Sequence, residues 1–295
     1  MAGEKKATVR DIASKAGVSV ATVSYVLNDK QGTKISDATR KKVLQIANLL
    51  NYSIPERYVG DSIKRGYSIG LVYKLTEGTV SRNAEIMQMI HLLAERLRRM
   101  DFECRLLPVD EMNDVAAPVN GLDGIIAIDL DKTTFKKMSG NYYIPILCLD
   151  MMINDFLFYQ IHTDFEELIR KGKEYLGEDF VFIMDGYCNE GYQEYIAGAL
   201  VKCPLYRFSE MDDKLIDEIK DKKVMVYGES LGIALLQYVK TENLLVITTS
   251  ESGEYLKKSV KSFHCDIEKK ANLSMSIMMN ALEKKFDVKH EYKIM

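Results

Sequence analysis

The chain has 295 residues, of which 47% are hydrophobic and 28% are charged, as in an ordinary globular protein with a sizeable core. No run approaches the roughly twenty apolar residues that a membrane-spanning helix needs, and the charged N-terminus is not followed by the apolar segment of a secretory signal. We therefore expect no membrane association and a cytoplasmic protein of two or three structural units.

The formal net charge of −3 is unevenly distributed along the chain. Residues 1–66 hold twelve Lys and Arg against six Asp and Glu, whereas the remainder holds 28 basic and 37 acidic residues. A basic head on an acidic body favours a polyanionic partner for the head alone, although a solvated charged surface would give the same count. The five cysteines show no metal-ligand spacing, and we expect free thiols.

The N-terminal region carries the signals of two short helices joined by a tight turn. Thr8 can cap a first helix, with Asp11 three residues later as in a capping box. Gly17 can adopt the left-handed conformation that ends this helix, and Ser19 caps a second helix at Val20–Asn28. Apolar residues at helical spacing predict a shared core of Ile12, Ala13, Ala16, Val23, Val26 and Leu27.

A third helix is predicted from Ala38 to about Leu50, with Ser36 as its cap. Three short helices around one core, with a glycine in the connection between the first two, are typical of a helix-turn-helix unit. In that unit the second helix lies in the DNA major groove, with its N-terminal residues against the base edges. A three-helix packing module without a DNA role is the alternative.

The outward side chains of the second helix determine what such a head could recognise. Val20 and Ala21 can pack only against apolar groups such as the thymine methyl, and Tyr25 can offer its hydroxyl to a base edge or a phosphate. Short hydroxyl side chains suited to phosphate contacts are present at Ser19, Thr22 and Ser24.

The run Thr8–Asn28, the later run Ile35–Val43 and the segment Leu50–Tyr52 resemble the head of the LacI/GalR family of bacterial repressors. The resemblance implies that Val20, Ala21 and Tyr25 read bases. Tyr25 stands where an arginine is frequent, so the preferred operator should differ from that of arginine-bearing members. The implied backbone-contacting positions are Ser19, Thr22, Ser24, Asn28, Lys34, Ser36, Thr39 and Tyr52, and Thr8 and Arg10 complete the predicted DNA-binding set.

The segment Pro55–Gly66 stands where the family has a hinge that folds into a short helix on operator DNA and wedges an apolar side chain into the minor groove. Ile63 is the candidate wedge, because an apolar side chain can open a base step. Gly60 lowers helix propensity by about 1 kcal/mol relative to alanine, and Asp61 repels phosphate. We therefore expect a hinge that orders less readily than usual, with a plain flexible linker as the alternative.

From Tyr67 onward short apolar strands alternate with amphipathic helices, a pattern that predicts parallel sheets covered by helices. Two such sets suggest two α/β lobes with a ligand cleft between them. The predicted strands are 67–73, 102–107, 124–128, 144–149, 180–184, 224–227, 244–248 and 289–294, and the predicted helices are 84–100, 165–176, 191–200, 231–239 and 267–286.

The body resembles the effector domain of the same family, which has the shape of a periplasmic sugar-binding protein, most clearly at 122–126, 144–150 and 162–164. The predicted fold class is therefore α/β, with a three-helix helix-turn-helix head and a two-lobed periplasmic-binding-protein-like effector domain. We place the head at 1–54, the hinge at 55–66, lobe 1 at 67–160 with 267–286, and lobe 2 at 161–266 with 287–295.

The residues expected to bind a ligand depart from those of sugar-binding members. Tyr192 stands where an arginine is usual, and tyrosine cannot copy the bidentate recognition of arginine. Gly228 and Glu229 replace a common Asn-Asp pair, so a typical free sugar is not the expected effector. The candidate ligand residues are Tyr73, Lys74, Asp150, Phe156, Tyr187, Tyr192, Glu229 and Ser250, although they could equally be core or rim residues.

The sequence carries no dinucleotide-binding, P-loop, metalloprotease or serine-nucleophile motif, so we expect no enzyme, no cofactor and no metal. The main hypothesis is a homodimeric repressor that binds double-stranded, pseudo-palindromic operator DNA and responds to a small-molecule effector. The alternatives are a small-molecule binding protein without a DNA role, and a regulator whose body has lost ligand binding and only dimerises.

Overall fold

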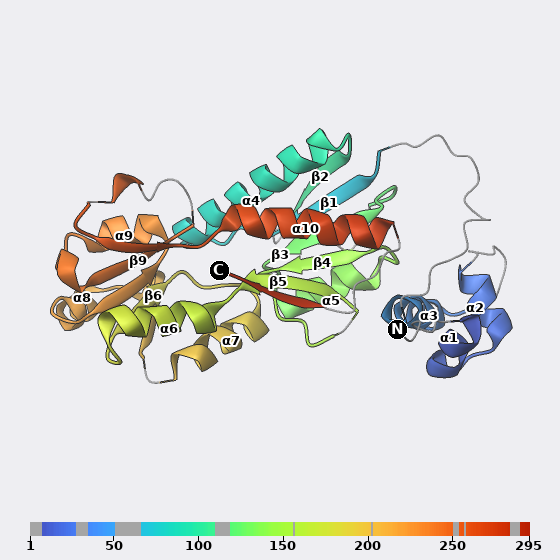
Figure 1. Cartoon of the computed structure of the whole chain (residues 1–295), viewed down its shortest axis with the longest axis horizontal. Helices are drawn as coiled ribbons and strands as arrows, with labels where there is room; N and C mark the ends of the chain where they lie inside the picture. The colour runs from blue at the N-terminus through green and yellow to red at the C-terminus, as the bar shows by residue number, and fades with distance from the viewer. Residues whose placement is uncertain are drawn as a thin grey trace, which may run out of the picture.

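The computed structural model describes residues 8–27, 35–50, 66–109, 119–155, 157–201, 203–249, 254–256, 258–283 and 290–295, with the backbone alone at positions 37, 41, 44, 45, 48 and 49. In this part of the chain, short helices form an N-terminal head and two parallel sheets form the body (Figure 1). No helix of the described residues is long and apolar enough to span a membrane. The helices of the head are α1 (Val9–Ala16), α2 (Val20–Leu27) and α3 (Asp37–Leu49).

The head packs its helices around one small core, as predicted. Thr8 caps α1 in a complete capping box, because its hydroxyl accepts a hydrogen bond from Asp11 N at 3.3 Å and its own N–H donates to the Asp11 carboxylate at 2.8 Å. Gly17 has a φ of 67° and ends α1 in the left-handed conformation. The buried core residues are Ile12, Ala13, Ala16, Val23, Val26, Val43 and Ala47.

The first sheet of the body has six strands in parallel pairs, in the order β11-β5-β4-β3-β1-β2. Helices α4 and α10 lie side by side over this sheet (Figure 1), and Leu93 of α4 shares a core with Ile69 of β1 and Met278 of α10. Helix α5 contributes Phe135 to the core on the other face, against Ile125. The elements are β1 (Ser68–Tyr73), α4 (Val80–Arg99), β2 (Glu103–Pro108), β3 (Gly124–Ile128), α5 (Lys132–Gly140), β4 (Ile146–Leu149), β5 (Tyr159–Thr163), α10 (Ile267–Leu282) and β11 (Glu291–Ile294).

The second sheet has five strands, also in parallel pairs, in the order β10-β9-β8-β6-β7. Helices α6 and α7 cover one face through Phe165 and Ile196, and α8 and α9 cover the other through Ile219 and Leu235. The elements are α6 (Phe165–Leu176), β6 (Val181–Met184), α7 (Glu190–Leu200), β7 (Leu205–Arg207), η2 (Phe208–Glu210), α8 (Asp213–Ile219), β8 (Val224–Tyr227), α9 (Glu229–Leu235), η3 (Thr241–Asn243), β9 (Leu244–Thr248) and β10 (Lys261–His264).

The last strand lies in the first sheet, so our prediction that residues 287–295 belong to lobe 2 is wrong for β11. β11 pairs with β5: Gln160 N donates to His290 O at 2.7 Å, and Asp164 N donates to Ile294 O at 2.9 Å. β5 was not predicted as a strand, and it pairs with β4 as far as Leu149. Without β11, the outer edge of β5 would have backbone N–H and C=O groups without hydrogen-bond partners. Pairing with β11 satisfies these groups, so β11 lies in the first sheet.

Candidate functional site

The first half of α2 presents the side chains that were expected to read bases. Val20, Ala21 and Tyr25 are exposed, Val20 to 48% and Tyr25 to 38%. Val23 and Val26, on the other side of the helix, are buried in the core of the head. The helix can therefore enter a groove of DNA without disturbing the core behind it.

The predicted hydroxyl residues of the head also cap its helices. Ser19 Oγ accepts a hydrogen bond from Thr22 N at 3.0 Å and lies 2.9 Å from Thr22 Oγ1. Ser36 Oγ accepts one from Thr39 N at 3.2 Å and lies 2.9 Å from Thr39 Oγ1. These caps fix the hydroxyls near the helix N-termini, where phosphate contacts are favourable. Thr8 is held in its capping box, Arg10 is exposed and Ser24 is half-buried, whereas Asn28, Lys34, Tyr52 and Ile63 lie outside the described residues.

Arg82, in the first turn of α4, is the centre of a buried cluster of charges in the body. Its Nη1 donates to Glu85 Oε2 at 2.7 Å, its Nε to Asp129 Oδ2 at 3.0 Å, and its Nη1 and Nη2 to Asp150 Oδ2 at 3.2 Å. The guanidinium carbon lies 4.1 Å from the centre of the Tyr187 ring. Burial alone would lower the pKa of Arg82, but Glu85 and the other neighbours outweigh it and raise that pKa, so Arg82 stays charged.

Lys270 of α10 is a second buried cation of this cluster. Its Nζ donates to Asp150 Oδ1 at 2.7 Å and to Thr163 Oγ1 at 3.0 Å. Burial would raise the pKa of Asp150, but Lys270 and Arg82 outweigh it and hold that pKa below its usual value. Burial would likewise lower the pKa of Lys270, but Asp150 more than offsets this and raises it.

Three carboxylates of this region directly follow strands: Asp129 follows β3, Asp150 follows β4 and Asp185 follows β6. The carboxyl ends of parallel strands are where open α/β sheets bind their ligands. Asp129 and Asp150 also have φ values of 50° and 52°, a left-handed conformation that residues with side chains rarely adopt. Strained residues of this kind concentrate at functional sites.

Hydrogen bonds join the two lobes at this cluster. The backbone N–H of Arg82, from the first lobe, donates to Asp185 Oδ2 of the second at 3.0 Å. Tyr227 Oη, at the end of β8, donates to Glu85 Oε1 at 3.0 Å. The lobes therefore meet through buried polar groups whose partners are specific. Asp129 Oδ1 also accepts from Cys188 N at 2.8 Å and from Asn189 N at 3.1 Å.

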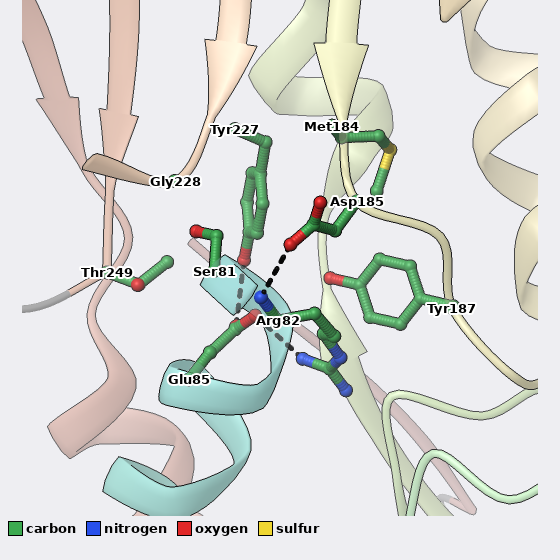
Figure 2. A pocket seen from close by; sticks show the side chains of 9 residues that line it. All are labelled: Ser81, Arg82, Glu85, Met184, Asp185, Tyr187, Tyr227, Gly228 and Thr249. Atoms are coloured by element: carbon green, nitrogen blue, oxygen red, sulfur yellow. Dashed lines mark hydrogen bonds and ion pairs between the residues drawn. The ribbon is translucent and has the colours of Figure 1, made fainter. Parts of the chain in front are cut away.

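A small pocket lies between the lobes beside Arg82, with a cavity volume of about 10 Å³. This is close to the room that one water molecule needs. Figure 2 shows that side chains from the start of α4 and from the ends of strands of the second sheet surround it. We call it the interlobe pocket. Its lining residues are Ser81, Arg82, Glu85, Met184, Asp185, Tyr187, Tyr227, Gly228 and Thr249.

Of the predicted ligand residues, only Tyr187 lines the interlobe pocket in the described part of the chain. Asp150 instead holds Arg82 and Lys270 in place. The remaining candidates are dispersed: Tyr73 is buried in the core of the first lobe, Lys74 pairs with Asp131 at 3.7 Å, Glu229 accepts a hydrogen bond from Thr249 N at 3.0 Å, and Phe156 and Ser250 lie outside the described residues.

Tyr192, which was predicted as a ligand residue, does not line the interlobe pocket. Its side chain is 0% exposed and packs in the core of the second lobe. Its hydroxyl accepts a hydrogen bond from Thr163 N at 3.1 Å and donates one to Thr163 O at 3.2 Å. A tyrosine whose hydroxyl is fully satisfied by backbone can be buried completely, and no group of it remains for a ligand.

A helix-turn-helix head followed by a two-lobed, periplasmic-binding-protein-like α/β body defines the class of this protein. The fold is similar to that of a lac repressor dimer bound to operator and an anti-inducer, with a TM-score of 0.58 and 18% identity. The match covers 98% of this chain and 96% of that one.

Residues 8–55 match the bacterial regulatory proteins of the lacI family. The chain is 33% identical over 97 residues to the sucrose operon repressor of Vibrio alginolyticus, a match that covers 31% of this chain and 99% of that sequence. It is 30% identical over 139 residues to the HTH-type transcriptional regulator GanR of Bacillus subtilis (strain 168), covering 47% of this chain but only 32% of GanR. The next two curated relatives are likewise matched over only 43% and 56% of their length. The protein belongs to the lacI family.

Proposed function

We propose that the protein is a sequence-specific DNA-binding transcription regulator, a cytoplasmic repressor that binds a pseudo-palindromic operator as a homodimer. The observation that carries the proposal is the solvent-exposed face of α2, with Val20, Ala21 and Tyr25 in front of a packed core. Membership of the lacI family supports it, since the relatives are called transcriptional regulators or repressors, and the lac repressor structure is a dimer on its operator.

The body is proposed to bind a small molecule in the interlobe pocket and thereby to change the spacing of the two heads. Groups from both lobes converge on the pocket, so a ligand there would favour one arrangement of the lobes over another. A typical free sugar is a poor candidate, because the cavity of about 10 Å³ is far smaller than a sugar ring.

Selection from a random double-stranded DNA library, at two salt concentrations, tests the DNA-binding role. We expect one enriched palindrome and an affinity that falls as the salt concentration rises, because phosphate contacts release counterions. A library without an enriched palindrome would favour the small-molecule binding protein without a DNA role.

Tyr25→Ala tests the base-reading assignment within the head. A lost base contact should weaken operator binding by about ten- to one-hundred-fold and relax the preference at one position of each half-site. Tyr238→Ala is the matched control, because Tyr238 has a similar exposure, 41% against 38%, but lies in the second lobe. If Tyr25→Ala selects the same operator with the same affinity, Tyr25 reads no base.

A regulator whose body acts without a ligand is the second candidate. The observation in its favour is that side chains of the chain itself fill most of the space between the lobes, where Arg82 is only 4% exposed. Constant operator affinity in the presence of a library of small metabolites, none of which binds the body, would support this candidate.

A further inference from the structure

Two hydrogen-bonding atoms of the interlobe pocket, Asp185 Oδ1 and Tyr187 Oη, have no partner among the described residues. Both side chains are buried, with exposures of 5% and 4%. Figure 2 shows the Tyr187 hydroxyl pointing toward the space between Asp185 and Arg82. A buried polar atom without a partner is costly, and its presence in a native site points to a missing ligand, ion or water.

The buried charged groups in and next to the interlobe pocket carry more negative than positive charge: the two cations are Arg82 and Lys270, and the five carboxylates are those of Glu85, Asp129, Asp150, Asp185 and Glu229. Asp150 is paired with both cations, at 3.2 Å and 2.7 Å. Asp185, by contrast, forms no ion pair within the described part of the chain, and burial raises its pKa. A cation next to Asp185 would therefore give this carboxylate an ion-pair partner that the described residues do not supply.

The pocket also has the size and the lining that an ammonium group requires. A cavity of about 10 Å³ holds a group of the size of one water molecule, and an ammonium group is nearly that size. Ser81 and Thr249, which carry hydroxyl groups, line the pocket together with Asp185 and Tyr187, and the Thr249 hydroxyl donates to Glu229 Oε2 at 3.4 Å. Several oxygen acceptors around a compact space suit the three N–H donors of a primary ammonium. An anion would meet the surplus of carboxylates, and a sugar ring would exceed the space.

We propose that the interlobe pocket binds the ammonium group of a short primary amine, through Asp185 and Tyr187. This inference rests on the proposed function, in which the pocket holds a small-molecule effector. A second small cavity borders the same Tyr227. Ile267 and Ile294 give part of its lining, and the charged side chains of Glu85, Asp266 and Lys270 give another part. The carbon chain of the amine extends toward that cavity, so the effector class is a short aliphatic amine and not a sugar.

Titration calorimetry of the full chain without DNA tests the proposal. The probes are ethylamine and putrescine, and the controls are ethanol, acetate and potassium chloride, which lack an ammonium group. We expect saturable binding of the amines alone, with ammonium chloride competing against ethylamine for the same site. Equal binding of ethanol or acetate, or no binding of either amine, would overturn the proposal.

Variants of the two binding residues locate the site. Asp185→Asn keeps the shape and an acceptor for the Arg82 N–H but removes the charge, so amine affinity should fall by about ten- to one-hundred-fold. Tyr187→Phe removes one hydrogen bond, and the loss should be about two- to tenfold. Asp179→Asn makes the same change of charge at an exposed position before β6 and should bind amines as the wild type does.

Amine binding of wild-type strength in both Asp185→Asn and Tyr187→Phe would place the ligand elsewhere and contradict the proposal. Melting curves check that each variant is folded, and the tyrosine variant keeps the test decisive if the aspartate variant unfolds. A chain that selects an operator but binds no amine contradicts this inference and leaves the regulator function intact. A chain that binds amines at this pocket but selects no operator supports the pocket and contradicts the regulator.

Discussion

At the scale of single residues, the stability of the body depends on Arg82, whose positive charge compensates the negative charge of buried carboxylates. The guanidinium is 4% exposed and bonds to Glu85, Asp129 and Asp150. Removing one partner of such a cluster leaves uncompensated charge in a medium that solvates it poorly, and this is more damaging than the loss of the contact itself.

Replacing Arg82 by methionine should therefore lower the free energy of unfolding by about 3–5 kcal/mol, measured from the urea midpoint of the full chain. Arg99→Met is the control, since Arg99 lies on the same helix in an exposed ion pair with Glu95, and exposed pairs contribute about 0–1 kcal/mol. Equal urea midpoints for the two variants would show that Arg82 does not stabilise the cluster.

Asp185 gives a prediction about pH, because burial raises its pKa in the folded state. The folded protein holds this proton more tightly than the unfolded chain, so the associated stability is present at low pH and is lost as the pH rises through the raised pKa. An asparagine at position 185 does not ionise, so the Asp185→Asn variant does not lose this stability as the pH rises. We expect the variant to melt above the wild type at pH 7, with a difference that shrinks toward about pH 4.

The exposed change Asp179→Asn should leave the melting temperature at its wild-type value across the same pH range. A gain in Asp185→Asn that is equally large at both ends of the range would show that the carboxylate of Asp185 is not destabilised by burial.

At the scale of elements, helix α1 of the head begins at a capping box that the sequence already specifies. Thr8→Ala removes both hydrogen bonds of the Thr8 hydroxyl with Asp11, and it should lower the stability of the head by about 1 kcal/mol. Ser14→Ala, an exposed position within α1, is the control and should change it little. Thermal melting followed by circular dichroism measures both, and equal melting of the two variants would contradict the cap.

The head could be predicted almost residue by residue because its signals are local. Caps at Ser19 and Ser36, a left-handed glycine and a helical apolar period each act within a few residues. The shorter elements of the body were missed for the opposite reason. Helices α5 and α8 begin at the caps Asp131 and Asp212, but each has too few apolar residues for a clear period.

Edge strands were also hard to predict, because a short half-exposed run does not say which sheet it joins. β7 and β11 have three and four residues, with mostly exposed or half-exposed side chains. Their position depends on the open strand edge that the rest of the fold leaves, and only the assembled sheet contains that information.

The interlobe pocket illustrates the same limit at the level of chemistry. Asp129 and Asp185 each directly follow a predicted strand, and that position is a signal that could have identified them. Arg82 has no comparable signal, because nothing local shows that a charged residue early in a helix will be buried. Asp150 was predicted as a ligand residue, yet it pairs with Arg82 and Lys270 and does not line the pocket.

At the scale of the whole molecule, the two lobes are held together by a few specific polar bonds and one very close approach. Gly228 at the end of β8 has a φ of 111°, and a Cβ there would lie 2.1 Å from Ser81 Oγ and 3.2 Å from Ser81 Cβ. Ser81 immediately precedes Arg82, whose backbone N–H bonds to Asp185. The positive φ favours glycine at position 228, and a larger residue there would also have to displace the Ser81 side chain of the other lobe.

Gly228→Ala should push the lobes apart and lower stability by about 1–3 kcal/mol, because alanine is strained at this φ and its methyl group displaces Ser81. Gly198→Ala is the matched control: Gly198 lies in α7 with open space around it, so alanine should be neutral or stabilise by about 0.5–1 kcal/mol. Small-angle scattering of both variants, together with their melting temperatures, measures the effect. A Gly228→Ala protein with wild-type radius of gyration and melting temperature would show that the lobes do not depend on this contact. An increased radius together with weakened amine binding would link the closure of the lobes to the interlobe pocket.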